Sequence, residues 1–261
     1  MPLDRRRRVR TLRVTDATHA MSPQGISYQL GAPRPRLARA VLVGGTARRA
    51  LMGLSRGPDG RPHETFSGKR TDGAPLEGHR HAFFLCDDAD GDGVIDTLLV
   101  WCRSAFDARA LMALDQLSEL WGEAVPRVEL VRHPAGMPTG VPRLLATAAT
   151  WRSLTPFVPT RHAKLRGGRL VDGPTMEAAR ACAHLGLPHP VAVEAGIQPS
   201  PTHGASWRAF VTERAGGGRR AGAAPVGLRL RFASPVAGPI ALGYGAHYGL
   251  GLFVPDEPPP A

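Results

Sequence analysis

The sequence predicts an α+β protein made of two ferredoxin-like domains in tandem, the βαββαβ fold that RNA-recognition modules also use. Two observations support this prediction. The first half of the chain orders its elements as strand, helix, strand, strand, helix, strand, and a similar β-rich pattern follows a linker at 133–142. We therefore expect a basic flexible arm at 1–24, a first domain at 25–140, and a second domain at 141–261 that contains a C-terminal glycine-rich loop.

The elements of the first half follow from hydrophobic periodicity and from end signals. Alternating apolar residues predict strands, and apolar residues at helical spacing predict helices. A capping box from Ser104 to Asp107 and a stop at Gly122 bound the second helix. The expected elements are a strand at 25–30, a helix at 35–55, strands at 78–86 and 93–102, a helix at 104–122 and a strand at 127–132.

The second half reads in the same way. Pro174 at the first helical position and Gly186 after the last turn bound one predicted helix. The expected elements are a strand near 151–159, the helix at 174–186, strands at 191–195, 207–214 and 227–232, and a glycine-rich end at 238–253.

Composition restricts the class of protein. A chain of 261 residues that is 43% apolar can bury a substantial core. It contains no apolar run near the ~20 residues that a membrane span requires, so we expect a cytoplasmic protein without a membrane partner. The three cysteines, Cys86, Cys102 and Cys182, lack C-x-x-C spacing, and we expect buried thiols rather than disulfides or a zinc site.

The charge is strongly positive and unevenly distributed. The net charge is +11, yet residues 84–130 hold ten acidic against three basic side chains, so the remainder carries +18. Such a surface typically binds a polyanion, because each neutralised phosphate releases a condensed counterion. A solvated charged face is the alternative. We favour nucleic-acid binding.

The segment "CDDADGDGVIDTLLVW" resembles a calcium-binding loop, with Asp88, Asp90, Asp92 and Asp96 at ligand positions. The twelfth position should be a bidentate carboxylate on a helix, but it is Leu99 within a β-rich run. The two Asp-Gly pairs are instead strong hairpin signals. We therefore predict a hairpin, and we expect no metal and no other cofactor.

His79 and His81 are the candidate catalytic residues. They stand two apart at the start of a predicted strand, so their side chains should leave on the same face. Imidazoles titrate near neutral pH, as acid-base cleavage of RNA requires. The alternative is that they bond within the core or meet water at a sheet edge.

Two further segments suit contact with RNA. The run "TRHAKLRGGR" is a basic loop whose arginines can hold phosphates, or simply a solvated loop. The run "GYGAHYGLG" has closely spaced glycines that allow backbone amides to approach a ligand, or that form a tight turn with bulges. The candidate RNA-binding residues are Arg161, His162, Lys164, Arg166, Arg169, Gly243, Gly245, His247, Gly249 and Gly251.

Three blocks together resemble a known family. The runs "GHRHAFFLCDDADGDGVIDTLLVW", "TPFVPTRHAKLRGG" and "GPIALGYGAHYGLGLF" are similar to the repeat-processing endoribonucleases of the RAMP superfamily, and most similar to the protein of type I-U (I-G) CRISPR systems. The last block fits that superfamily's glycine-rich loop at 243–251. The resemblance extends from about residue 26 to residue 254.

The resemblance implies a function. It implies metal-independent cleavage of precursor CRISPR RNA within its repeats, and retention of the product with other subunits of a type I effector complex. In-line attack by a 2′-hydroxyl would leave a 2′,3′-cyclic phosphate and a 5′-hydroxyl. A non-catalytic RNA-binding subunit is the alternative, and a metal-dependent hydrolase built on the aspartate hairpin is a third possibility.

Overall fold

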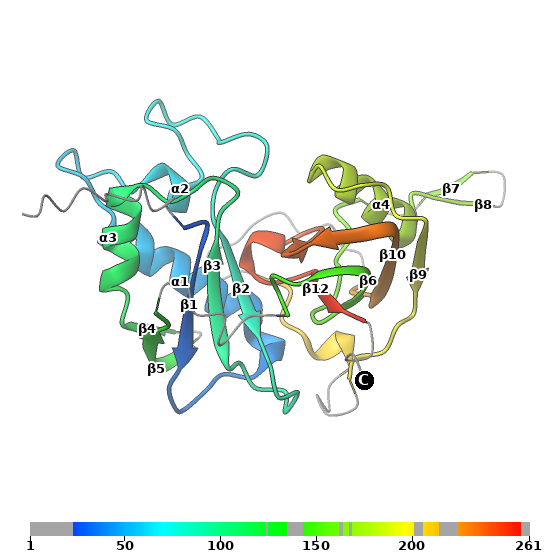
Figure 1. Ribbon diagram of the computed structural model, residues 1–261, viewed down its shortest axis with the longest axis horizontal. Helices are drawn as coiled ribbons and strands as arrows, with labels where there is room; N and C mark the ends of the chain where they lie inside the picture. Colours follow the sequence, from blue (N-terminus) through cyan, green and yellow to red (C-terminus); the bar gives the residue numbers. More distant parts are fainter. Residues whose placement is uncertain are drawn as a thin grey trace, which may run out of the picture.

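The computed structural model describes residues 23–123, 125–134, 143–161, 164–166, 169–200, 206–213 and 224–256. Two halves lie side by side, and each is built on one sheet (Figure 1). The predicted arm at 1–24 lies outside the described residues except for 23 and 24. The linker at 133–142 is described only at 133 and 134, so the predicted domain boundary within it stays a prediction.

The first sheet has the strand order of a ferredoxin-like unit. Its spatial order is β2, β3, β1, β5, β4, and all neighbouring strands are antiparallel. Without the short edge strand β4, these are the second, third, first and fourth strands of a βαββαβ unit, which is the strand order of the ferredoxin-like fold, as predicted. The strands are β1 (Gly25–Leu30), β2 (Phe83–Asp87), β3 (Thr97–Trp101), β4 (Glu119–Gly122) and β5 (Val125–Arg132).

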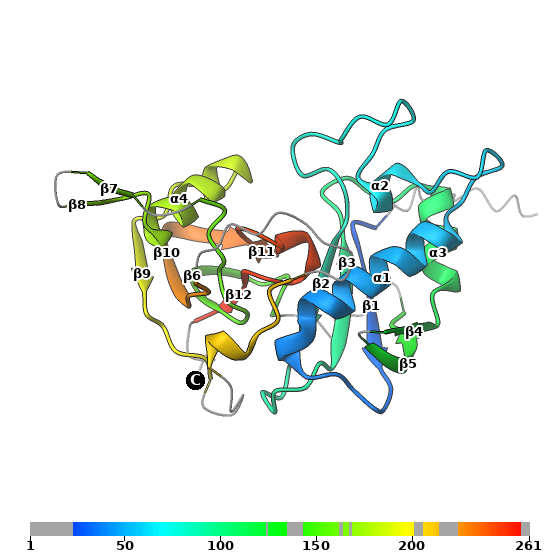
Figure 2. The ribbon, with the colours of Figure 1, turned by 180° about the vertical axis from the view of Figure 1, so that it is seen from behind.

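Helices cover one face of this sheet (Figure 2). Along β1, Ile26, Tyr28 and Leu30 are buried at alternate positions, and the Tyr28 hydroxyl donates to the carbonyl of Leu114 at 2.6 Å. Burial of each such side chain contributes about 1.5–3 kcal/mol. The helices are η1 (Leu37–Arg39), α1 (Ala40–Leu54), α2 (Glu64–Ser67) and α3 (Ala108–Gln116).

The prediction of one helix over 104–122 was wrong at both ends. The N-cap of α3 is Asp107, whose carboxylate accepts from the amide of Ala110 at 2.8 Å. The chain leaves the helix after residue 116, and residues 119–122 pair with β5 as an edge strand. This pairing satisfies backbone groups and buries Leu120, which a longer helix would not have done.

The second sheet repeats the same order with one replacement. Its order is β11, β12, β6, β10, β9, so β12, β6, β10 and β9 again follow the ferredoxin-like pattern. The helix α4 (Pro174–His184) is present, and Gly186 follows it with φ of +68°, as predicted. Between β10 and β12, however, stands the short helix η4 (Ala246–Tyr248) rather than an α-helix. The strands are β6 (Thr147–Ser153), β9 (Ala192–Ala195), β10 (Leu228–Ala237), β11 (Ile240–Ala241) and β12 (Leu252–Pro255).

Three details of the second half differ from the sequence-based expectation. The strand expected near 151–159 is β6, which begins at Thr147 and ends at Ser153. The segment predicted as a strand at 207–214 begins instead with a single helical turn, η3 (Trp207–Ala209), where the Trp207 indole donates to the carbonyl of Ile197 at 2.6 Å. The basic run contains a small hairpin of β7 (Lys164–Arg166) and β8 (Arg169–Val171), which projects from the end of this half (Figure 1).

The two halves meet where α1 and β2 contact η4 (Figure 2). Gly44 of α1 allows this approach, because a Cβ there would lie 2.8 Å from the carbonyl oxygen of Tyr248 and 3.1 Å from that of Phe84. Both halves contribute to one continuous hydrophobic core, and all three cysteines are buried thiols, as expected. Among the described residues, no helix is both long and apolar enough to cross a membrane.

Candidate active site between the two halves

Three histidines from distant parts of the sequence meet where the halves touch. His79 and His81 lie just before β2, and His247 lies in η4. The Nδ1 atom of His79 is 2.9 Å from Nε2 of His247. The ring of His81 stacks on the ring of His247 with a centroid separation of 3.6 Å, and Phe83 stacks on the same ring at 3.8 Å. His247, which sequence reasoning assigned to RNA binding, is therefore the centre of the cluster.

The reason given for pairing His79 with His81 was wrong. The predicted strand at 78–86 starts only at Phe83, and the chain turns at Gly78 and His79, whose φ angles are +67° and +54°. Alternation along a strand therefore does not apply to these side chains. They come together because His247 contacts both of them.

The hydrogen bonds define which nitrogens carry protons. Nδ1 of His247 lies 3.2 Å from the carbonyl oxygen of Ala82, which can only accept, so this Nδ1 must donate. In neutral His247 the other nitrogen, Nε2, is then an acceptor, and Nδ1 of His79 donates to it. Neutral His79 consequently carries its lone pair on Nε2, which is the form that a general base requires.

The environment keeps these imidazoles neutral. Burial lowers the pKa of His247 well below its ordinary value, with a contribution from nearby His81. Burial, followed by Arg48 and His79, lowers the pKa of His81 to about 4. The pKa of His79 is also lowered, first by burial and then by Arg103 and His184. All three rings are therefore predominantly neutral at pH 7.

The glycine-rich loop supports His247 by its backbone conformation. Gly243, Gly245, Gly249 and Gly251 all have positive φ. At Gly251 a Cβ would lie 1.9 Å from the carbonyl oxygen of Leu242, so a side chain is excluded there. The amides of Gly249 and Gly251 donate to the carbonyls of Ala246 and Pro156 within the protein. The loop thus acts as the rigid turn that presents His247, and these two amides are already used.

A cavity of about 170 Å³ adjoins His79. Its lining combines the segment before β2, the glycine-rich loop and α4, so both halves contribute. The charged and titratable lining residues are His79, Arg161, Glu177, Arg180 and His184. Gly243 also lines it, whereas His81 and His247 are not among its lining residues.

Glu177 fixes the position of one wall of this cavity. This buried carboxylate on α4 accepts from the amide of Thr160 at 2.7 Å, from its hydroxyl, and from the amide of Arg161 at 3.4 Å. Its negative charge is therefore committed to the backbone turn at 160–161. Arg180 pairs with Asp172 at 2.5 Å. The cavity as a whole presents more positive than negative groups, which suits a phosphate.

The predicted RNA-binding residues of the basic run do not all lie at the cavity. Arg161 is exposed and lines the cavity. Lys164, Arg166 and Arg169 belong to the projecting β7–β8 hairpin. His162 lies outside the described residues. The basic run is thus divided between the cavity wall and a separate hairpin.

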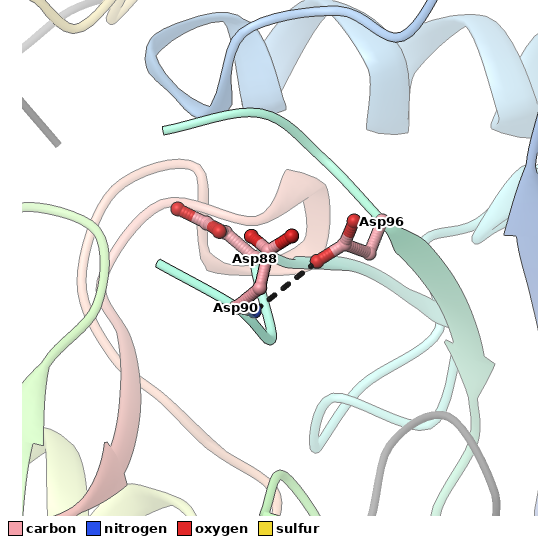
Figure 3. A group of neighbouring side chains, drawn as sticks. All are labelled: Asp88, Asp90 and Asp96. Atoms are coloured by element: carbon pink, nitrogen blue, oxygen red, sulfur yellow. Dashed lines mark hydrogen bonds between the residues drawn. The ribbon is translucent and has the colours of Figure 1, made fainter. Parts of the chain in front are cut away.

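The aspartate segment forms the predicted hairpin between β2 and β3, paired from Phe83 opposite Trp101 to Asp87 opposite Thr97. Oxygens of Asp88, Asp90 and Asp96 lie within 4.8 Å of one another (Figure 3). The amides of Gly91 and Gly93 donate to Asp88 at 2.8 and 2.9 Å, and those of Ala89 and Asp90 donate to Asp96 at 2.7 and 3.4 Å. These carboxylates therefore shape the turn itself, which accounts for their clustering.

Comparison with known proteins gives the following matches. No family model matches the sequence, and no curated protein matches it. Among solved structures, a Cas6 product complex is 17% identical, with a TM-score of 0.44 over 90% of this chain and 100% of that one. A RAMP protein that binds different RNA substrates is 11% identical, with a TM-score of 0.39 over 89% and 98%. Csf5, a type IV Cas6 crRNA endonuclease, is 14% identical, with a TM-score of 0.37 over 89% and 98%.

Sequence reasoning missed three residues of the cavity: Glu177, Arg180 and His184. They follow one another at intervals of three and four along α4, so they share one helix face. That spacing was visible in the sequence. Which partner the face would meet was not, because the cavity forms only when the glycine-rich loop and the segment before β2 approach it.

Proposed function

We propose that this protein is a RAMP-type endoribonuclease that cleaves precursor CRISPR RNA within its repeats without a metal ion. The observation that carries the reaction type is the hydrogen-bonded chain from the Ala82 carbonyl through His247 to His79 at a basic cavity. The substrate class comes from the resemblance of three sequence blocks to repeat-processing endoribonucleases.

The chemistry begins with proton removal. Nε2 of His79 accepts the proton of a 2′-hydroxyl, and the resulting oxygen attacks the adjacent phosphorus in line with the departing 5′-oxygen. Arg161 at the cavity wall stabilises the negative charge that develops on the phosphorane. The products carry a 2′,3′-cyclic phosphate and a 5′-hydroxyl.

His247 acts by holding His79 in the required tautomer, much as the carboxylate does in a Ser-His-Asp triad. His81 was paired with His79 as a second acid-base group. Its pKa of about 4 makes an imidazolium rare at pH 7, and its Nδ1 is buried without a hydrogen-bond partner. In our proposal His81 supports the stack around His247.

The charge distribution orients the RNA. The β7–β8 hairpin continues the basic run beyond Arg161, and we propose that it binds phosphates that flank the cleavage site. The acidic segment at 84–130 repels phosphates and should face away from the RNA. After cleavage, the product would stay bound in the cytoplasm and join other subunits of a type I effector complex, as the I-U resemblance suggests.

Incubation of the purified protein with its cognate repeat RNA in excess EDTA tests this function. We expect cleavage. The 5′ product should end in a 2′,3′-cyclic phosphate, so a ligase that requires a 3′-hydroxyl should not join it until the cyclic phosphate has been opened and removed. Binding without cleavage would instead indicate a non-catalytic RNA-binding subunit. Cleavage that EDTA abolishes and Mg²⁺ or Ca²⁺ restores would indicate a metal-dependent nuclease.

A further inference from the structure

The cavity contains a second histidine that the proposed reaction has not used. His184 lies in the last turn of α4 and is exposed, and it lines the same cavity as His79. The two residues come from different halves of the protein and reach the cavity on different elements. Their proximity is also evident from the contribution of His184 to the lowered pKa of His79.

We propose that His184 is the general acid of the site, and that the scissile phosphate occupies the cavity between His184 and His79. The proposal rests on the proposed endoribonuclease function and names a catalytic residue that the sequence had not indicated. It divides the reaction between the halves, since the base comes from the first half and the acid from the second.

His184 lies at the carbonyl end of α4, beside the cavity. The carbonyl end of a helix carries a partial negative charge, which attracts a positively charged side chain. The charged neighbours in the cavity are Arg161 and Arg180, and the one carboxylate, Glu177, is buried and committed to the turn at 160–161. Glu177 is therefore the one acidic side chain among the described lining residues, and its charge is directed at that turn rather than at a bound phosphate, which a free carboxylate would repel.

The alternative acid, His81, lacks access. It does not line the cavity, and its ring is stacked against His247 at 3.6 Å. With its pKa lowered to about 4, fewer than about one molecule in a hundred carries an imidazolium there at pH 7. An acid needs both contact with the leaving oxygen and a proton to give.

The proton balance of the step is complete. The 2′-hydroxyl proton moves to Nε2 of His79 while the bond from the 2′-oxygen to phosphorus forms. The bond from phosphorus to the 5′-oxygen breaks, and that oxygen takes a proton from the imidazolium of His184. His79 ends protonated and His184 ends neutral, and exchange with water restores both.

A substrate with sulfur in place of the bridging 5′-oxygen tests the assignment, because a thiolate leaves without a proton. We expect His184→Ala to slow single-turnover cleavage of the normal repeat RNA by about 10²-fold, and to cleave the sulfur-substituted RNA at nearly the wild-type rate. His79→Ala should remain slow on both substrates, since the base is still required. RNA affinity of the His184 variant should change by less than about threefold.

His189→Ala is the matched control. His189 is also exposed and follows the same helix, but it lines a different groove and its Nδ1 contacts the carbonyl of Pro190. The His189→Ala variant should cleave both substrates at the wild-type rate. His184→Ala that is equally slow on both substrates, or normal on the unmodified RNA, would overturn the assignment. Absence of cleavage by the wild-type protein would instead refute the proposed function itself.

Discussion

Substitution of Gly44 by alanine tests whether η4 packs against α1 as closely as the structure shows. A Cβ at this position would lie 2.8 Å from the carbonyl oxygen of Tyr248, 3.0 Å from its Cα, and 3.1 Å from the carbonyl oxygen of Phe84. All three atoms are backbone, so none can move aside by rotating a side chain. Such overpacking costs about 1–3 kcal/mol, whereas alanine gains about 1 kcal/mol over glycine in a helix interior. We expect the free energy of unfolding to fall by about 1 kcal/mol in total.

Gly45 provides the control in the same helix. A Cβ there meets only the guanidinium of Arg49, at 3.9 Å. Gly45→Ala should therefore raise the free energy of unfolding by about 0.5–1 kcal/mol. The helix-propensity gain is common to both variants, so the difference between them measures the clash, about 1–3 kcal/mol.

Urea unfolding followed by circular dichroism measures this difference, and a cleavage assay adds a functional result. The clash pushes η4 away from α1 and moves His247 relative to His79, so Gly44→Ala should also cleave RNA more slowly than Gly45→Ala. Equal stabilisation by both substitutions, with equal cleavage rates, would refute the close approach and the positioning role assigned to it.

Four further predictions concern the site and the RNA. His79→Ala should lower single-turnover cleavage by about 10²-fold or more with little change in RNA affinity, and an unchanged rate would remove it from the mechanism. Because the pKa of His79 is lowered, its neutral form persists as the pH falls, and the acidic limb of the rate profile should have its midpoint below pH 6.5, not at or above it. The pKa of His81 is about 4 in the folded protein against 6.5 ordinarily, so His81 should contribute a loss of stability of about 1–2 kcal/mol, after solvent screening, as pH drops from about 6.5 toward 4. His79 and His247, whose pKa values are also lowered, add to this loss, so His81→Phe should reduce it in urea titrations without abolishing it. Replacing both Arg166 and Arg169 by glutamate should weaken RNA binding and reduce the slope of log K against log salt by about 0.7–0.9 per lost contact. Arg127→Glu, in the acidic segment, is the control and should have little effect on binding. The opposite pattern would place the RNA on the other face.

Local signals were sufficient for most of the elements. Pro174 and Gly186 bounded α4, the alternation at 25–30 predicted β1, and the Asp-Gly pairs predicted the hairpin between β2 and β3. Local signals failed where pairing with a distant segment changed the secondary structure. Residues 119–122 have helical spacing in the sequence, but pairing with β5 makes them a strand.

The candidate site divides in the same way. Sequence patterns identified His79 and His81 as candidate acid-base residues and recognised the glycine-rich loop, because residue type and spacing are properties of a short segment. They did not reveal that His247 binds His79.

The sequence alone therefore predicted the fold class, showed the basic character of the chain and supplied a short set of candidate site residues. The tertiary structure decided which of these side chains lie together, and it placed His184, on a helix face with no motif of its own, at the same cavity as His79. The physical reason is one of distance along the chain. Residues 79, 184 and 247 lie too far apart for any local pattern to relate them, and they come together only when the glycine-rich loop fits against Gly44 and closes the two halves on each other.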